Sequence, residues 1–442
     1  MEIKREIEDK LIAWQKSKRR KPLVLRGARQ VGKTYLLKRF GKAHFSSVAY
    51  FNFEEQPELK QFFLQTKDTN RLLDNLSLVH GKPIEPQKTL VIFDEIQECN
   101  EALNSLKYFN ENAPEYAIAC AGSLLGVALS KGQSFPVGKV DFLQVQPLGF
   151  PEFLSADDPA LFDYLENVNK PEPLSDIFFN PLVDKLKKYF ISGGMPEAAV
   201  SLLEEKDIEK TQQVLQNILN AYALDFSKHA ETKDVPKINH IFSSIPSQLA
   251  RENKKFLYQA AQPGARARDY ENALLWLADA GLVYRIFRIS KPGLPLSAYD
   301  DLSAFKLYLL DVGLLRRLSG LHPSAISEGN RLFNEFKGAL TENFVLQHLV
   351  SQFETTPRYW TSGAQAEVDF IIQSGNEIIP AEVKSDENIR SRSLTMYHQQ
   401  YNSPLRIRYS LKNLKLDDGL LNIPVFMAGY TQKLLMLLRK NK

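Results

Sequence analysis

The sequence predicts an α/β protein whose N-terminal part is built on a parallel sheet. Short, continuously apolar runs recur in the first third of the chain, and segments with helical periodicity separate them. Strands of this kind are buried on both faces, so their alternation with helices indicates a sheet covered by helices on both sides. A glycine-rich turn follows the first apolar run directly and leads into a helical segment.

The individual elements follow from these patterns. A helix is predicted over residues 2–17, where apolar side chains recur at spacings of three and four. Apolar runs then predict strands, and amphipathic segments predict helices between them. The strands are expected at residues 22–25, 48–51, 90–93 and 116–121, and the helices at residues 33–39, 58–64 and 101–109.

After residue 150 the sequence becomes rich in helical patterns. Helical segments precede two apolar runs, at residues 281–286 and 306–310, and this order predicts helices followed by a two-stranded wing. The last segment combines a helix at residues 331–350 with strands at residues 366–373 and 377–385.

The composition is that of an ordinary globular protein. The 442 residues are 44% hydrophobic, and 56 basic against 52 acidic side chains give a net charge of +4. So small a charge does not by itself indicate a nucleic acid or an anionic membrane as partner. Two cysteines exclude a disulfide scaffold. Together with a charged N-terminus and no apolar run of about 18 residues, these features predict a cytoplasmic protein with no membrane partner.

Residues 27–34 satisfy the pattern G-x-x-x-x-G-K-[ST] of a phosphate-binding loop, in its required place between a strand and a helix. The glycines let the backbone approach phosphate oxygens, and successive N–H groups form an anion nest. Lys33 is expected to neutralise the terminal phosphates of ATP, and the Thr34 hydroxyl to ligate Mg²⁺. The alternative is a chance match in a glycine-rich turn. The expected nucleotide-binding residues are Gly27, Ala28, Arg29, Gln30, Val31, Gly32, Lys33 and Thr34.

Two acids follow the apolar run at residues 90–93, which places them at the carboxyl edge of the same sheet. Asp94 is expected to hold the Mg²⁺, and Glu95 to orient and deprotonate the attacking water. Gln97 is a further neighbour of water or phosphate. The strand at residues 116–121 leads to Ser123, which is either a sensor of the γ-phosphate or an ordinary surface serine.

A second constellation lies in the C-terminal segment. Glu382 and Lys384 share one face of a strand, and a hairpin would bring Asp369 near Glu382. Glu342 lies on the apolar stripe of the preceding helix, where an unpaired carboxylate is costly. Carboxylates and a lysine that converge are what metal-dependent phosphodiester hydrolysis needs, with one or two Mg²⁺ or Mn²⁺ ions. The alternative is a solvated hairpin face.

Five segments together resemble the prokaryotic AAA-type ATPases that carry a C-terminal domain of unknown function with a restriction-endonuclease-like core. They lie at residues 27–34, 93–97, 121–123, 146–153 and 193–197. The resemblance spans nearly the whole chain. It implies an ASCE-type P-loop ATPase core over residues 1–150, a helical lid over 151–233, a winged helix over 234–325 and a PD-(D/E)xK nuclease-like domain over 326–442.

The chain departs from such proteins at Lys139, where they often carry an arginine. If that arginine stabilises the transferring phosphoryl group, lysine retains the charge but loses the planar fork. Slow turnover, or another basic residue in this role, is the expected consequence.

The function expected from these observations is Mg²⁺-dependent ATP binding and hydrolysis, with nucleotide state coupled to DNA that the C-terminal domain binds or cleaves. The alternative is a nucleotide-gated switch or scaffold that binds a protein partner and has no nuclease activity. Because such a site can need a basic residue from a neighbouring copy, a homo-oligomer, with a ring as one form, is also expected.

Overall fold

The structure is a computed structural model. It describes residues 1–123, 126–127, 135–252, 254–328, 331–363, 366–385 and 391–440. The chain divides into two compact units. The smaller unit comprises residues 4–146 and 279–282, and the larger unit comprises residues 1–3, 147–278 and 283–442.

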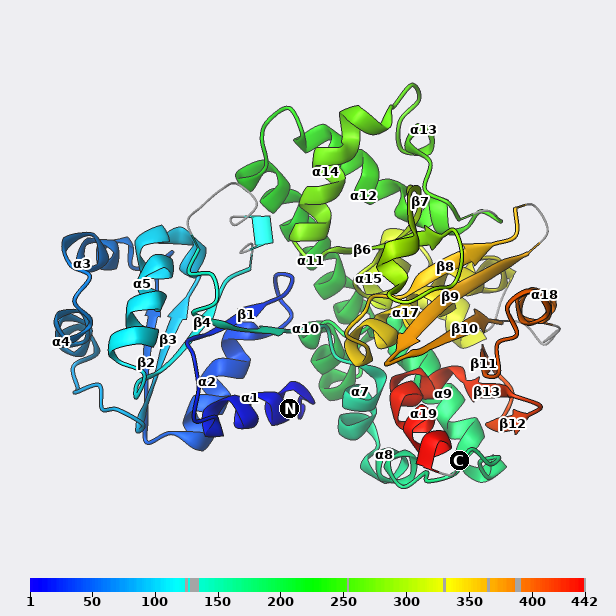
Figure 1. Ribbon diagram of the computed structural model, residues 1–442, viewed down its shortest axis with the longest axis horizontal. Helices are drawn as coiled ribbons and strands as arrows, with labels where there is room; N and C mark the ends of the chain where they lie inside the picture. The colour runs from blue at the N-terminus through cyan, green and yellow to red at the C-terminus, as the bar shows by residue number, and fades with distance from the viewer. Residues whose placement is uncertain are drawn as a thin grey trace. The chain divides into compact units, whose positions relative to one another are not determined.

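The smaller unit is a parallel five-stranded sheet with the strand order β2-β3-β4-β1-β5, flanked by helices (Figure 1). The prediction of a parallel α/β fold is therefore confirmed. Its strands are β1 (Leu23–Arg26), β2 (Ser47–Asn52), β3 (Thr89–Asp94), β4 (Ala117–Ala121) and β5 (Asp141–Gln144). Its helices are α1 (Ile7–Lys16), α2 (Lys33–His44), α3 (Lys60–Gln65), α4 (Thr69–His80) and α5 (Asn100–Asn112).

The strands β3 and β4 are buried over their whole length, as their unbroken apolar sequence predicts. One face of the sheet packs on α3, α4 and α5 around a core that includes Phe51, Phe93 and Leu106. Helix α2 packs against the strands β2, β3 and β4. The five strands thus bring the loops at their carboxyl ends to one edge.

Helix α1 begins at Ile7, later than the predicted start at residue 2. The side chain of Glu8, in the first turn of the helix, accepts a hydrogen bond from the backbone N–H of Arg5 at 2.9 Å. This contact caps the N-terminal end of the helix. The residues before it run outside the helix, and Ile3 is buried.

The larger unit contains the helix-rich middle of the chain and a mixed sheet. Its helices before the first strand are α7 (Phe150–Asp157), α8 (Pro159–Glu166), α9 (Asp176–Ser192), α10 (Pro196–Val200), α11 (Ile208–His229), α12 (Val235–Leu249), α13 (Tyr258–Ala261) and α14 (Ala267–Asp279). The later helices are α15 (Val312–Leu318), α16 (Pro323–Glu328), α17 (Arg331–Gln352), α18 (Arg392–Tyr401) and α19 (Thr431–Lys440).

The sheet of the larger unit has eight strands in the order β12-β13-β11-β10-β9-β8-β6-β7 (Figure 1). The strands are β6 (Val283–Ile289), β7 (Asp300–Leu309), β8 (Arg358–Thr361), β9 (Glu367–Ser374), β10 (Glu377–Val383), β11 (Arg406–Ser410), β12 (Lys415–Asp417) and β13 (Leu420–Pro424). The two pairs of strands predicted from sequence, β6 with β7 and β9 with β10, each form antiparallel neighbours. The sequence did not predict that both pairs belong to one sheet.

A buried carboxylate organises the turn between α9 and α10. Asp311, which precedes α15, accepts hydrogen bonds from the backbone N–H of Gly194 at 2.6 Å and of Leu314 at 2.9 Å. The side-chain amide of Gln347 on α17 lies 3.4 Å from the same carboxylate. A methyl group on Gly193, whose φ is +66°, would lie 2.1 Å from Asp311 Oδ1, so the glycine allows this close approach.

Candidate active site

The loop between β1 and α2 has the backbone of a phosphate-binding turn. Gly27 and Gly32 have positive φ angles of +146° and +89°, and Gln30 also has a positive φ, of 66°. A Cβ atom on Gly27 would lie 2.3 Å from the carbonyl oxygen of Val145, which leaves no room for a side chain. Residues 27–32 therefore wind in front of the N-terminus of α2, where backbone N–H groups favour an anion.

Lys33 is buried and turned back onto this loop. Its ammonium donates to the carbonyl oxygens of Gly27 at 2.9 Å and Ala28 at 2.7 Å. Burial lowers the pKa of Lys33 to about 8, against the opposing effect of the Glu95 and Asp94 carboxylates. The lysine thus sits at the loop, where it can exchange carbonyl partners for phosphate oxygens.

Thr34 and Asp94 meet at the carboxyl edge of the sheet. The Thr34 hydroxyl donates to Asp94 Oδ2 at 2.8 Å, although the two residues come from α2 and β3. The hydroxyl of Tyr50 on β2 donates to the same oxygen at 2.8 Å. A hydroxyl and a carboxylate are the oxygen ligands that Mg²⁺ takes in nucleotide sites, so these residues fit the metal predicted for them.

Glu95 follows Asp94 with a positive φ of 48°, which turns its side chain away from the path of β3. Its Oε2 accepts hydrogen bonds from the Ser123 hydroxyl at 3.1 Å and from the Gln97 side-chain amide at 2.5 Å. Ser123 is 7% exposed, and it follows the strand β4 that lies between β1 and β3. In this structure Ser123 therefore positions the carboxylate of Glu95.

Two contributors to this site were missed in the sequence. Tyr50 lies in an apolar run that predicts only a strand. Arg5 precedes α1, and its guanidinium donates to the carbonyl oxygens of Val31 at 3.2 Å and Gln146 at 2.6 Å, which ties the loop to the strand end. Neither residue belongs to a motif, and both act through contacts between segments distant in sequence.

Tyr50→Phe is expected to weaken Mg²⁺ binding, so that half-maximal ATP turnover needs about tenfold more Mg²⁺. The reason is that the metal-binding carboxylate of Asp94 loses the hydroxyl that orients it. The measurement is ATP turnover as a function of Mg²⁺ concentration. Tyr35→Phe is the matched control, because Tyr35 is an exposed tyrosine of α2. Equal Mg²⁺ dependence in the two variants would show that Tyr50 does not position Asp94.

Lys139, which stands where the resembling proteins often have arginine, precedes β5. Its ammonium forms an ion pair with Glu111 on α5 at 2.8 Å, and both side chains are more than two-fifths exposed.

The second predicted constellation lies in the larger unit. Glu342 is on the buried face of α17, as predicted. The β9–β10 hairpin brings Asp369 beside the end of β10, where Asp369 Oδ2 accepts a hydrogen bond from the Val383 N–H at 2.9 Å. Glu382 is buried and pairs with Lys384 at 2.7 Å.

Two lysines that the sequence did not single out complete this cluster. Lys306 on β7 is fully buried and forms an ion pair with Glu367, and its ammonium lies 3.8 Å from Asp369 Oδ1. Lys254 forms an ion pair with Glu342, whose other oxygen accepts from the Tyr308 hydroxyl at 3.1 Å.

These contacts decide the charge of the cluster. Burial raises the pKa of Glu342, but the two lysines outweigh it, so that the pKa is lowered overall. Burial and the Glu342 carboxylate raise the pKa of Asp369. Within the described ranges, no three His, Cys, Asp or Glu side chains are placed to hold a metal ion. In this structure lysines pair with the acids of the cluster, Glu342 with Lys254, Glu367 with Lys306 and Glu382 with Lys384.

Three segments match family models. Residues 19–154 match an AAA domain, and residues 183–325 and 337–426 match two domains of unknown function, DUF8612 and DUF4143. The chain thus carries a P-loop domain of the AAA type.

Solved structures that match this chain include a Walker-type ATPase of Pyrococcus abyssi, at 17% identity over 72% of this chain and 96% of that chain, with a TM-score of 0.45. The RuvB Holliday junction branch migration motor of Thermotoga maritima has 15% identity over 64% and 90% of the two chains, with a TM-score of 0.28. The ORC1 protein of Aeropyrum pernix in complex with DNA has 14% identity over 73% and 93%, with a TM-score of 0.27.

A search of curated proteins returns no match to this sequence. Among the residues that the structure describes, no helix combines the length and the apolar character needed to span a membrane.

Proposed function

We propose that this protein binds ATP with Mg²⁺ and hydrolyses it at the loop between β1 and α2. The observation that carries the proposal is the meeting of three predicted groups at one edge of the sheet. The Thr34 hydroxyl contacts Asp94 at 2.8 Å, and the carboxylate of the next residue, Glu95, is held by Ser123 and Gln97.

Each group has a defined task. The N–H groups of residues 27–32 and the ammonium of Lys33 bind the phosphates, and Thr34 with Asp94 would hold the Mg²⁺. When bound, Mg²⁺ neutralises charge on the terminal phosphates. Glu95, oriented by its two hydrogen bonds, accepts the proton of the attacking water.

Lys33→Ala tests nucleotide binding. We expect the variant to lose at least about tenfold in affinity for a fluorescent ATP analogue, because it loses a charge-assisted contact to the phosphates. Lys42→Ala, an exposed lysine on the same helix, is the control and should bind as the wild type does. Equal affinity in the two variants would overturn the proposed site.

We further propose that nucleotide state controls how the larger unit engages DNA. Four basic side chains gather around a cavity on its sheet, at Arg406, Arg408, Lys412 and Lys415, and this observation favours DNA over a protein partner. Cleavage of DNA is not part of the proposal: Glu342, Asp369 and Glu382 each lie beside a lysine, at Lys254, Lys306 and Lys384.

The domain assignment is also a proposal. Helices α12 and α14 followed by the β6–β7 hairpin are the elements of the winged helix expected at residues 234–325, with a helical lid at 151–233 and a nuclease-like fold at 326–442. Assembly into a homo-oligomer is proposed as well, with the partly exposed Lys139 as the basic residue offered to a neighbouring copy.

A further inference from the structure

A polar row crosses the C-terminal half of the eight-stranded sheet. In the strand register, Glu382 of β10 stands beside Arg408 of β11, Arg408 beside Asn422 of β13, and Asn422 beside Lys415 of β12. Residues paired in register point to the same face of a sheet. The row therefore runs on one face from the buried acid Glu382 to an exposed basic edge.

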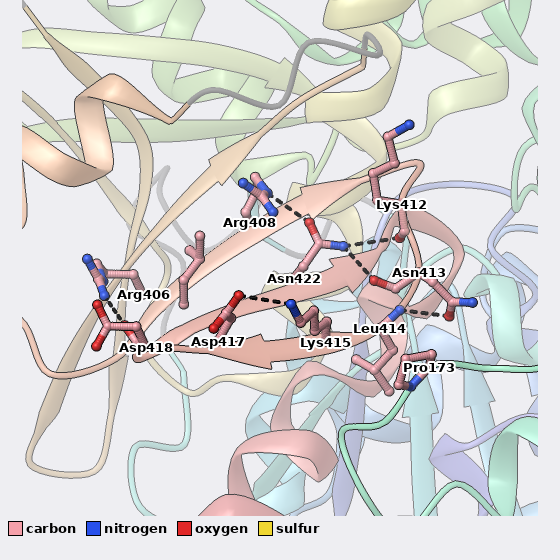
Figure 2. A pocket seen from close by; sticks show the side chains of 11 residues that line it. Pro173, Arg406, Arg408, Lys412, Asn413, Leu414, Lys415, Asp417, Asp418 and Asn422 are labelled. Carbon is pink, nitrogen blue, oxygen red and sulfur yellow. Dashed lines mark hydrogen bonds and ion pairs between the residues drawn. The ribbon is translucent and has the colours of Figure 1, made fainter.

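A cavity of about 640 Å³ opens on this row (Figure 2). Figure 2 shows Arg406 and Arg408 on β11, with Asn422 hydrogen-bonded to Arg408 Nε at 2.8 Å. Lys412 and Lys415 lie across from them, on the turn after β11 and on β12. Four cationic side chains against two carboxylates, Asp417 and Asp418, leave the cavity net positive.

The basic side chains around the cavity differ in the hydrogen-bond and ion-pair partners that they have. Asp417 pairs with Lys415 at 2.9 Å, so this lysine is partly neutralised. Arg406 donates to the backbone carbonyl of Asp418, but its buried Nε has no hydrogen-bond partner among the described residues. The structure gives the exposed Lys412 ammonium no partner within the described ranges either. The exposed ammonium of Lys412, which lies beside guanidinium groups that are held in place, is suited to an anion that arrives from solution.

We infer that this cavity binds the phosphodiester backbone of a single strand of nucleic acid, with Arg406 and Lys412 as its main phosphate contacts. The inference deepens the DNA engagement proposed above and rests on it. A cavity of about 640 Å³ admits a few phosphate groups of one strand, and it is far too small for a duplex.

The side chains that line the cavity also predict whether binding depends on the base sequence of the strand. None of the described side chains that line the cavity is aromatic, so bases have no platform on which to stack. Contacts to phosphates carry no sequence information. Binding is therefore independent of base sequence and falls steeply with salt.

The test uses the full chain and fluorescein-labelled single strands of roughly 20 nucleotides, followed by anisotropy between about 50 and 200 mM salt. Lys412→Glu is expected to bind about tenfold more weakly, with a log–log salt slope smaller by about one. Arg406→Gln is expected to weaken binding in the same direction. Lys440→Glu makes the same charge change on an exposed lysine outside the cavity, and it should leave the affinity unchanged.

Several outcomes would overturn the inference. These are equal affinities for Lys412→Glu and Lys440→Glu, no salt dependence in the wild type, or displacement of the strand by inorganic phosphate beyond the effect of matched chloride, which would indicate a small-anion site. ATP turnover separates this inference from the proposed function. Lys412→Glu should hydrolyse ATP at the wild-type rate. If Lys33→Ala instead binds the ATP analogue as tightly as the wild type does, the ATPase proposal alone is overturned.

Discussion

Glu95→Gln is expected to bind ATP with nearly wild-type affinity and to hydrolyse it at least about 100-fold more slowly. The amide has the shape of the carboxylate but cannot accept the proton of the attacking water. The side chain of Glu95 is held by Ser123 and Gln97, which lie outside the phosphate-binding loop. The substitution should therefore slow ATP hydrolysis without weakening ATP binding.

The measurement is single-turnover phosphate release beside the affinity for a fluorescent ATP analogue. Glu98→Gln is the matched control, because Glu98 lies in the same short helical turn as Gln97 and undergoes the same change of charge. The control should hydrolyse ATP within about threefold of the wild-type rate. If Glu95→Gln turns over ATP as fast as Glu98→Gln does, Glu95 is not the base.

Asp311→Ala has the largest expected effect on stability: it should lower the free energy of unfolding by about 3–5 kcal/mol. The variant leaves the N–H groups of Gly194 and Leu314 buried without their acceptor. Urea denaturation in a Trp14→Phe background measures it, because the remaining tryptophans, Trp276 and Trp360, both belong to the larger unit. A loss below about 1 kcal/mol would contradict the role of Asp311 as an organising acceptor.

The pH dependence gives an independent readout of the same carboxylate. Burial raises the pKa of Asp311 to about 6, so the folded state binds its proton more tightly than the unfolded state does. This contribution to stability is complete below the unfolded pKa and is lost as the pH rises through about 6. The stability advantage of the wild type over Asp311→Asn should therefore be about 1 kcal/mol larger at pH 5 than at pH 7.

Much of the smaller unit could be predicted because its signals are local. The apolar runs that became β3 and β4 are continuous, and the motif of residues 27–34 lies where a strand turns into a helix. The order of the strands follows from pairings between distant segments, which no local pattern contains. The predicted start of α1 was wrong because its N-terminal end is set by a single side-chain contact, from the Arg5 N–H to Glu8, which the apolar periodicity does not show.

The candidate site divides in the same way. Lys33, Thr34, Asp94 and Glu95 belong to motifs whose spacing carries their chemistry. Tyr50, whose hydroxyl reaches Asp94 from a neighbouring strand, has no motif of its own. The C-terminal acids were found by spacing, as was Lys384, which pairs with Glu382. Lys254 and Lys306 come from segments roughly 60 to 90 residues away in sequence from the acids they pair with, so the full charge balance was not predictable.

The ion pair between the buried Lys306 and the half-buried Glu367 joins two segments that match different family models. One family match ends at residue 325 and the next begins at residue 337, so the lysine lies in one matched segment and the acid in the other. A gene fragment that carried either segment alone would encode half of an ion pair and a sheet with a bare inner edge. The two segments therefore depend on each other for a complete sheet and a paired lysine, and a fragment that holds only one of them is expected to fold less stably.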